Sequence, residues 1–450
     1  MTTEALSEKK KQLIGLVNYI RTNIDKLLIA KEIQPEEENY FKWVHDNPTY
    51  DENGELHPGR GSGITITKKT WWRIVIAISN MITKTDTFKD TLTYFKSNNI
   101  IKENSDILEY FIRKIIYQYI INPSTLLNDS NHLIDNFISE LEGKELRCYA
   151  NVELEGVTII PEHIDITTDI SLRRTKIEDV DKEIPMYPPF NTHQFPFVPS
   201  SVLHIQLYTK DMNGIQVFSA KVICLLRLFK VGSVLGNTIS RESDYMMPFF
   251  GGTITSGNTQ FAFDKYAIFT EDVPRLKEFF KTFLEIIPRN LYWPHDTIPN
   301  EIAISYQRYC TSLLDTGIIE KKIADVMAGL ESIFLTENIE VSYKLKVRVC
   351  RFFYYLGMDA KKVKSHIGQG YKIRSTYAHG SVLSKEDREK CSHENLFKEL
   401  GNYLRISIAL SILTQMNKIE FIKELEDSLI DKKVEEEFIA KISKWRYLVL

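Results

Sequence analysis

Apolar residues recur at spacings of three and four along the first part of the chain. Between Glu8 and Ile33 they are Leu13, Leu16, Val17, Ile20, Ile24, Leu27 and Leu28, which predicts an amphipathic helix. The pattern returns from Thr85 to Ile121 in two pieces that break around Asn98 and Asn99. Between these stretches, residues 46–63 are rich in Pro, Gly, Asn and Asp, a composition typical of a loop. Residues 1–143 are therefore predicted to form a helical N-terminal region.

The pattern then changes to alternation of apolar and polar residues. The segment LRCYANVELEGVTIIPEHIDITTD (146–169) is rich in Val, Ile and Thr, which predicts strands. SVLHIQLYT (201–209) and IQVFSAKVICLLRLFKVGSV (215–234) are predicted to continue the sheet, joined by a hairpin turn at 211–214. Leu276 to Ile287 is predicted to be a helix. We therefore expect a β-rich middle domain at 144–300, with a sensory or regulatory role.

Helical periodicity returns after Ile302 and predicts an all-helical C-terminal domain at 301–450. Its blocks are 302–314, 319–336, 340–357 and 396–426, with a shorter helical piece after Lys432. The whole chain is thus predicted to be an α+β protein with several domains, and its length of 450 residues favours two or three of them.

Composition narrows the classes of protein to which this chain could belong. The net charge of −3 argues against non-specific coating of nucleic acid. Five scattered cysteines without a CxxC pair make a zinc site or a disulfide framework improbable, and we expect no metal and no cofactor. The polar N-terminus does not resemble a signal peptide, and no run of about 18 apolar residues predicts a membrane span. These features predict a cytoplasmic protein with no membrane partner.

One short segment of the helical domain, IGQGYKIRSTYAHGS (367–381), combines residues suited to RNA chemistry. In its Arg-x4-His arrangement, His379 would act as general base on a ribose 2′-hydroxyl or as acid to the leaving 5′-oxygen. Arg374 would hold the scissile phosphate and stabilise its developing charge. Ser375 and Tyr377 would orient the imidazole or donate to phosphate.

The spacing alone is weak support, because roughly one such match is expected by chance in a chain with this many arginines and histidines. Arg388 and His393 form a second Arg-x4-His pair, and Arg289 and His295 form an Arg-x5-His pair. The first of these lies in a charged, polar run and the second in a Pro-containing linker. Gly368, Gly370 and Gly380 instead surround the 374–379 pair, which predicts that His379 lies at a helix boundary with open space around it.

A local basic excess precedes this motif. Residues 344–374 contain nine Lys or Arg against one acid, Asp359. Lys361, Lys364 and Lys372, with Tyr371 as a stacking surface, are candidate contacts to RNA. A solvated lysine face is about as plausible an interpretation for the lysines. Phe352 and Phe353 are predicted to be core, and Glu331 and Glu340 are predicted to pair with Arg348 or Arg351.

These residues resemble the HEPN superfamily, and within it the Apea-like HEPN proteins. The segment MAGLESIFLTENIEVSYKLKVRVCRFFYYLG (327–357) is similar to the opening helix pair of that family. Tyr371, Arg374, Ser375, His379 and Gly380 match its Tyr-x-x-Arg-Ser-x-x-x-His-Gly signature, and residues 396–416 would form its closing helix. Ser375 departs from the Asn, Asp or His that often follows the arginine in the wider superfamily, but it suits the Apea-like branch.

The resemblance implies an all-α HEPN bundle, homodimerisation that brings two Arg–His motifs into one cleft, and metal-independent endoribonuclease activity. It also implies a toxin or phage-defence setting, with RNA such as tRNA as substrate and a phage-derived trigger or an antitoxin as partner. Two alternatives stay open. The HEPN segment could be a non-catalytic module that binds RNA or nucleotide, or it could be a dimerisation handle for a middle domain that recognises another protein.

Overall fold

The computed structural model contains mostly helices, with some strands. The residues that it describes are 3–30, 36–46, 49–50, 56–57, 60–70, 72–101, 106–121, 123–174, 201–209, 212–243, 249–250, 266–294, 298–315, 317–337, 339–381 and 392–450. They fall into two compact units that are interleaved along the sequence. Unit 1 consists of Met1–Glu153, Thr175–Gln216 and Thr238–Gly252, and unit 2 of Leu154–Arg174, Val217–Asn237 and Thr253–Leu450.

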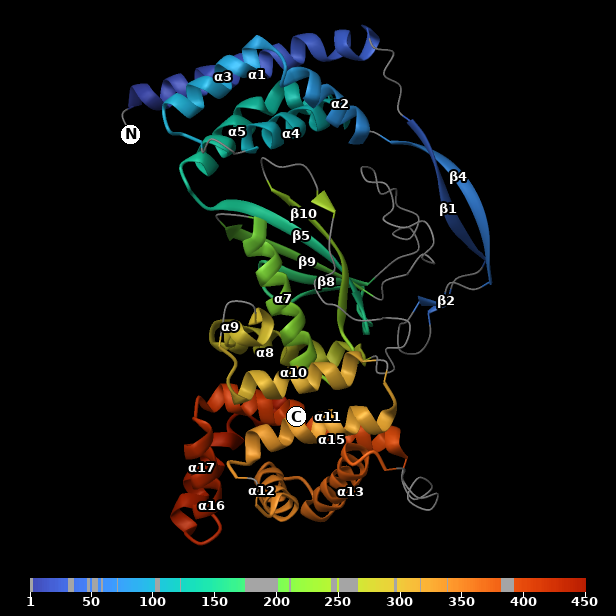
Figure 1. Ribbon diagram of the computed structural model, residues 1–450, viewed down its shortest axis with the longest axis vertical. Coiled ribbons are helices and arrows are strands. Elements are labelled where there is room, and N and C mark those ends of the chain that lie inside the picture. The colour runs from blue at the N-terminus through green and yellow to red at the C-terminus, as the bar shows by residue number, and fades with distance from the viewer. Residues whose placement is uncertain are drawn as a thin grey trace. The chain divides into compact units, whose positions relative to one another are not determined.

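Unit 1 begins with a group of helices that share one apolar core (Figure 1). α1 (Thr3–Ala30) packs against α2 (Trp72–Ile82), α3 (Asp86–Ser97), α4 (Ile107–Ile121) and α5 (Pro123–Leu141). The predicted first helix and the two-piece helical stretch are confirmed. α3 ends at its C-cap Asn98, and Asn99 has a φ of +53°, so the predicted break falls at these two asparagines.

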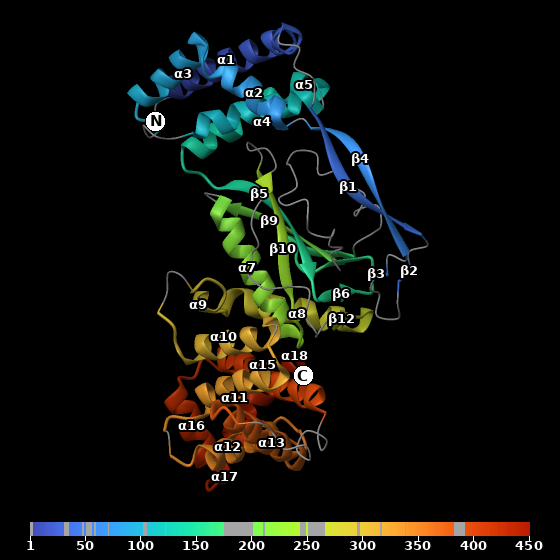
Figure 2. The same ribbon diagram turned by 45° about the vertical axis from the view of Figure 1, so that its right-hand side comes forward.

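The loop predicted at 46–63 is wrong in part. β1 (Glu36–Asp46) and β4 (Arg60–Thr70) form a long antiparallel ribbon with Glu36 opposite Thr70 and Asp46 opposite Arg60 (Figure 2). A short pair, β2 (Thr49–Tyr50) and β3 (Leu56–His57), lies between them in sequence. The glycines at the start of β4 led to the prediction of a loop, although Ile64-Thr-Ile-Thr67 alternates between apolar and polar residues as a strand does. The predicted helical N-terminal region therefore also contains strands.

Four further strands follow in the order β11-β10-β5-β9. They are β5 (Leu146–Glu155), β9 (Ser201–Thr209), β10 (Leu235–Ser243) and β11 (Phe249–Phe250). In unit 2, β7 (His163–Asp165) pairs antiparallel with β8 (Ile170–Arg174), and β6 (Val157–Ile159) pairs parallel with β12 (Tyr266–Ile268). Strands in 146–174 and at 201–209 are thus confirmed.

The strand predicted at 215–234 is wrong, because this segment forms most of helix α7 (Met212–Phe229). Gly214 lies inside the helix rather than in the predicted hairpin turn, and Asp211 lies outside the described residues. Every residue from Val222 to Phe229 is buried, including Arg227. A helix that is buried on all sides carries a continuous apolar run, and such a run does not distinguish it from a buried strand.

The predicted helical blocks after residue 300 are confirmed within the described residues (Figure 1). α11 (Ile319–Phe334) packs against α10 (Glu301–Leu314), α13 (Ala360–Ala378) and α15 (His393–Thr414), while α12 (Val341–Tyr355) packs on α13. Gln415, with a φ of +54°, divides the predicted 396–426 block into α15 and α16 (Lys418–Asp427). α17 (Lys432–Ser443) and α18 (Arg446–Val449) follow.

Helix α8 (Val273–Ile286) confirms the helix predicted at 276–287. It also belongs to unit 2 and packs against α15 and α18. It follows a single 3₁₀ turn, η2 (Thr270–Asp272), and precedes the short α9 (Arg289–Tyr292). Among the described residues, no helix has the length and apolar character needed to cross a membrane.

Candidate functional site

Helix α13 carries the Arg-x4-His motif at its C-terminal end, and both ends of the helix are capped. The Asp359 carboxylate accepts hydrogen bonds from the N–H groups of Lys361 and Lys362, at 2.8 and 3.3 Å. At the other end, Gly380 has a φ of +65°, its N–H donates to Tyr377 O, and the Ser381 N–H donates to Thr376 O. These two bonds form a Schellman motif, which requires a left-handed residue at the Gly380 position. The helix therefore ends at a defined point.

His379 is the C-cap residue of α13 and is exposed. The prediction that it lies at a helix boundary is confirmed. Gly368 and Gly370 do not mark that boundary, because both lie inside α13. A Cβ on Gly370 would approach Leu400 Cδ1 to 2.7 Å and Met327 Sδ to 2.8 Å, so this glycine allows α13 to pack closely against α11 and α15.

Arg374 contacts an acid, Glu331, that was predicted to pair with other arginines. Its Nη2 donates to Glu331 Oε2 of α11 at 2.8 Å, and its side chain is 33% exposed. Glu331 was predicted to pair with Arg348 or Arg351, and this is wrong: Arg348 pairs with Glu426 at 2.7 Å and Arg351 with Glu435 at 2.6 Å.

Burial raises the pKa of the Glu331 carboxyl, and the charge and hydrogen bond of Arg374 act in the opposite direction. Glu331 Oε1 has no hydrogen-bond partner among the described residues. The carboxylate therefore depends on Arg374 for compensation of its charge, and it holds the guanidinium in one orientation with part of the fork still accessible.

The other predicted motif residues lie on the same turns. Tyr371 lies under the Arg374 guanidinium, with 6.0 Å between Cζ and the ring centroid. Tyr377 is exposed and Ser375 is half-buried. Arg374 and His379 are five positions apart on one helix, so they project in different directions, and no hydrogen bond joins them within the described chain. One copy of the chain does not bring the predicted pair into contact.

Lys361 and Lys364 are exposed at the opposite end of α13. At 1.5 Å per residue they lie about 15–20 Å along the helix from Arg374. Lys372 is exposed one turn before the C-terminal turn. Phe352 and Phe353 are buried in the core, as predicted.

The basic excess of residues 344–374 is largely compensated by acids from elsewhere in the sequence. The ion pairs are Lys344–Glu337, Arg348–Glu426, Arg351–Glu435, Lys362–Glu399 and Arg374–Glu331. Charge counted along a segment therefore overstates the positive charge of the folded surface.

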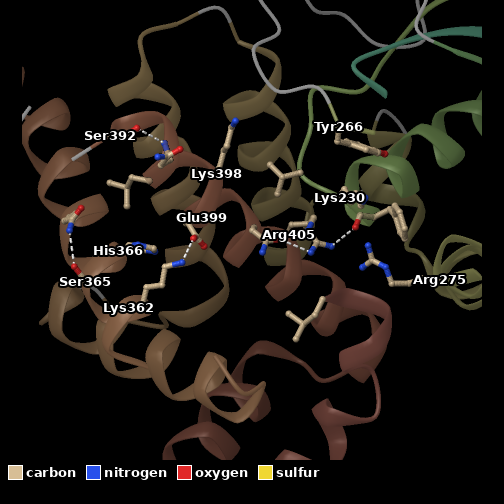
Figure 3. Close-up of a pocket in the computed structure, with 17 residues that line it drawn as sticks. Lys230, Tyr266, Arg275, Lys362, Ser365, His366, Ser392, Lys398, Glu399 and Arg405 are labelled. Atoms are coloured by element: carbon tan, nitrogen blue, oxygen red, sulfur yellow. Dashed lines mark hydrogen bonds and ion pairs between the residues drawn. The ribbon is translucent and has the colours of Figure 1, made fainter. Parts of the chain in front are cut away.

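A cavity of about 1050 Å³ in unit 2 was not predicted from sequence (Figure 3). One wall is the N-terminal half of α13, with Lys362, Ser365, His366 and Gln369; a second is α15, with Lys398, Glu399 and Arg405 among others. The remaining wall comes from Phe229, Lys230, Val231, Tyr266, Arg275 and Leu450. The lining residues come from segments more than 200 positions apart, and no local motif marks them.

His366 lies between the two helical walls of this cavity. Its Nδ1 lies 3.1 Å from the Tyr403 hydroxyl, and the two rings are stacked with centroids 6.0 Å apart. Burial lowers the pKa of His366; Glu399 raises it and Lys362 lowers it. The imidazole is therefore neutral near pH 7.

Within the described residues, no group of three or more His, Cys, Asp or Glu side chains is arranged to hold a metal ion. Neither the Arg374 region nor the cavity therefore offers an acidic or thiolate ligand set among these residues. No protein family, curated protein or solved structure matches the chain in sequence or structure comparisons.

Proposed function

We propose that this protein is a metal-independent endoribonuclease of the HEPN type, with Arg374 and His379 as its catalytic pair. The observation that carries the proposal is the last turn of α13. There a guanidinium oriented by Glu331 at 2.8 Å and an exposed histidine at a glycine-terminated helix end lie within six residues. These are the groups required for phosphate binding and for proton transfer.

In the proposed reaction, the ribose 2′-oxygen attacks the adjacent phosphorus while His379 accepts the 2′-hydroxyl proton. The bond from phosphorus to the 5′-oxygen breaks, that oxygen takes a proton from water, and His379 returns its proton to the resulting hydroxide. The products are a 2′,3′-cyclic phosphate and a 5′-hydroxyl end. Arg374 stabilises the negative charge that builds on the phosphoryl oxygens. Ser375 and Tyr377 assist by hydrogen bonding, and Tyr371, Lys372, Lys364 and Lys361 contact the RNA.

Arg374 and His379 of one copy do not touch, so the proposal includes a homodimer through the C-terminal helical domain that brings two motifs into one cleft. The setting proposed is a cytoplasmic toxin or phage-defence protein. Its residues 1–143 and 144–300 would form separate helical and β-rich domains that respond to a phage-derived trigger or an antitoxin. In this proposal the helical domain at 301–450 carries the chemistry, and it belongs to unit 2 together with Leu154–Arg174 and Val217–Asn237.

The test is cleavage of total RNA and of tRNA by the full chain in EDTA, with analysis of the product ends. Arg374→Ala should lower the rate about 100-fold or more, since removing one donor to a developing oxyanion has about this effect. Repeating the assay with residues 301–450 separates a regulated enzyme from an inactive one. Equal cleavage by native and variant proteins would contradict the proposal.

A second candidate, a non-catalytic RNA-binding module, is favoured by the Arg374–Glu331 ion pair, which gives the arginine a structural role. Arg374→Ala alone does not separate the two, because it leaves Glu331 buried without its counterion. The double variant Arg374→Ala with Glu331→Gln removes that charge. In the catalytic case it recovers the thermal stability of the native protein but not its cleavage. In the binding case the native protein has no activity to lose.

A further inference from the structure

The cavity between α8, α13 and α15 has a strongly uneven charge (Figure 3). Five of its lining side chains are cationic and one, Glu399, is acidic; the cations are Lys230, Arg275, Lys362, Lys398 and Arg405. Glu399 contacts Lys362 at 2.5 Å, so the acid of the lining is itself already paired. In a recess lined by protein, such an excess raises the local concentration of anions.

Two of the lining cations, Lys230 and Arg275, contact the same acid, Asp272, which does not line the cavity. The Asp272 carboxylate contacts Lys230 Nζ at 2.5 Å and Arg275 Nη2 at 3.7 Å, and it also accepts the N–H of Phe269. One carboxylate therefore serves two cations and a backbone donor. The pair keeps a net positive charge of one toward the cavity.

Arg275 carries a buried donor without a partner on the wall of the cavity. Its guanidinium lies 4.4 Å above the Phe229 ring centroid, it is 12% exposed, and its Nη1 has no hydrogen-bond partner among the described residues. Buried donors are nearly always paired, so an unpaired one on the wall of a large cavity points to a bound group that accepts from it.

Arg405 contributes charge but not free donors. Its nitrogens donate to Leu228 O, Phe229 O, Val449 O and Asn402 Oδ1 at 2.6–3.0 Å. Burial lowers its pKa to about 10, and the nearby charge of Arg275 lowers it as well. An anion in the cavity would act against both effects on the pKa of Arg405, because it favours the charged guanidinium.

From these observations we propose that the cavity binds a small phosphate-bearing ligand, with its phosphate at Arg275 and Lys230. A guanidinium and an ammonium together match phosphate better than a single carboxylate. The volume lies at the upper end of the range for small-molecule sites, which leaves room for an organic group beyond the phosphate. Tyr266, His366, Asn395 and Gln369 line that space and supply ring faces and amides.

This inference does not depend on RNA cleavage. The site would bind its ligand whether or not Arg374 and His379 are catalytic, and a binding measurement tests it separately.

The experiment is calorimetric titration of the full chain with ATP, inorganic tripolyphosphate and adenosine as probes. We expect ATP or tripolyphosphate to bind and adenosine to bind at least tenfold more weakly. Comparing the first two probes distinguishes a nucleoside phosphate from an inorganic one. Failure of both phosphate probes to bind would overturn the proposal.

Variants locate the site. Arg275→Gln and Lys230→Gln should each weaken binding of the phosphate probe about tenfold or more. Lys277→Gln, a change of an exposed lysine on the same helix α8 that does not line the cavity, should leave it unchanged. Lys230 is more exposed than Arg275, so its variant remains informative if the Arg275 variant does not fold, which a thermal melt without ligand will show.

Unchanged binding in Arg275→Gln and Lys230→Gln, or equal weakening by Lys277→Gln, would place the ligand elsewhere and overturn the proposal. The same variants should bind a single-stranded RNA with native affinity. If the variants instead bind single-stranded RNA more weakly, and the native protein binds neither phosphate probe, the cavity contacts RNA and is not a site for a small ligand.

Discussion

The two ends of helix α13 differ in how far the chain itself satisfies their polar groups. At the N-terminal end, Lys362 contacts Glu399 at 2.5 Å and His366 stacks on Tyr403, so these groups face other parts of the same unit. At the C-terminal end, Arg374 has one acid, Glu331, and no described residue hydrogen-bonds to the His379 imidazole. All described residues that line the cavity at the first end belong to unit 2. The second end presents a guanidinium and an imidazole with few partners among the described residues.

This difference separates changes that affect chemistry from those that affect folding. His379 is exposed and can be altered with little loss of stability, because it has few contacts to lose. Arg374 differs from it, because it compensates the charge of Glu331. A residue in the closely packed middle of the helix cannot be altered with so little loss. The following predictions test that distinction in order of decreasing effect.

The largest effect is expected from His379→Ala. It should lower RNA cleavage about 100-fold or more, as loss of a general base does, while the free energy of unfolding changes by less than about 0.5 kcal/mol. Cleavage assays and urea unfolding of the same preparation measure both. The matched control is His393→Ala, from the second Arg-x4-His pair, whose Arg388 lies outside the described residues. Similar losses in both variants would remove the reason to choose the 374–379 pair.

Two glycines on α13 should respond in opposite directions. Gly370→Ala should lower the free energy of unfolding by about 1–3 kcal/mol, because the added methyl group overlaps buried Leu400 and Met327. Gly368→Ala should raise it by about 0.5–1 kcal/mol, because its Cβ meets only Lys346 Cε at 3.4 Å and alanine favours the helix. Urea denaturation measures both. Equal effects would mean that α13 is not closely packed at Gly370.

The N-cap of α13 is expected to stabilise the folded protein about as much as a typical N-cap does. Asp359→Ala removes the acceptor for two backbone N–H groups and should destabilise the protein by about 1 kcal/mol. Asp359→Ser should recover most of that loss. If alanine and serine at this position behave alike, the cap does not contribute.

The smallest effect concerns pH. Because burial lowers the pKa of His366 below its ordinary value of 6.5, the unfolded chain binds the proton at a higher pH than the folded protein does. The stability contributed by the neutral imidazole is present above pH 6.5 and is lost as pH falls below it. His366→Gln should therefore reduce the loss of stability between about pH 7.5 and about pH 5.5 in urea unfolding. An identical loss in native and variant proteins would contradict this.

The spacing of apolar residues along the chain was sufficient to predict the helices that bury one face. The helices at 8–30 and 86–121 and the predicted blocks after residue 300 follow from apolar spacing. α13 was not among those blocks, and only its end was predicted, from Gly380, which permits the left-handed cap. The burial of Phe352 and Phe353 was also predictable, because both lie on the apolar face of α12. Sequence likewise placed Arg374 and His379 on adjacent turns.

The tertiary structure alone decided which groups meet. Glu331 faces Arg374 across 43 positions, and the acids that neutralise the basic segment lie up to 84 positions away, so charge read along the chain could not predict the surface. The unpaired Nη1 of Arg275 and the cavity beside it arise only when α8, α13 and α15 pack together. α7 was misread as a strand because burial on every side removes the periodicity that separates helix from strand. Spacing along the chain reports which side of an element is apolar, whereas a site depends on side chains that only packing brings together.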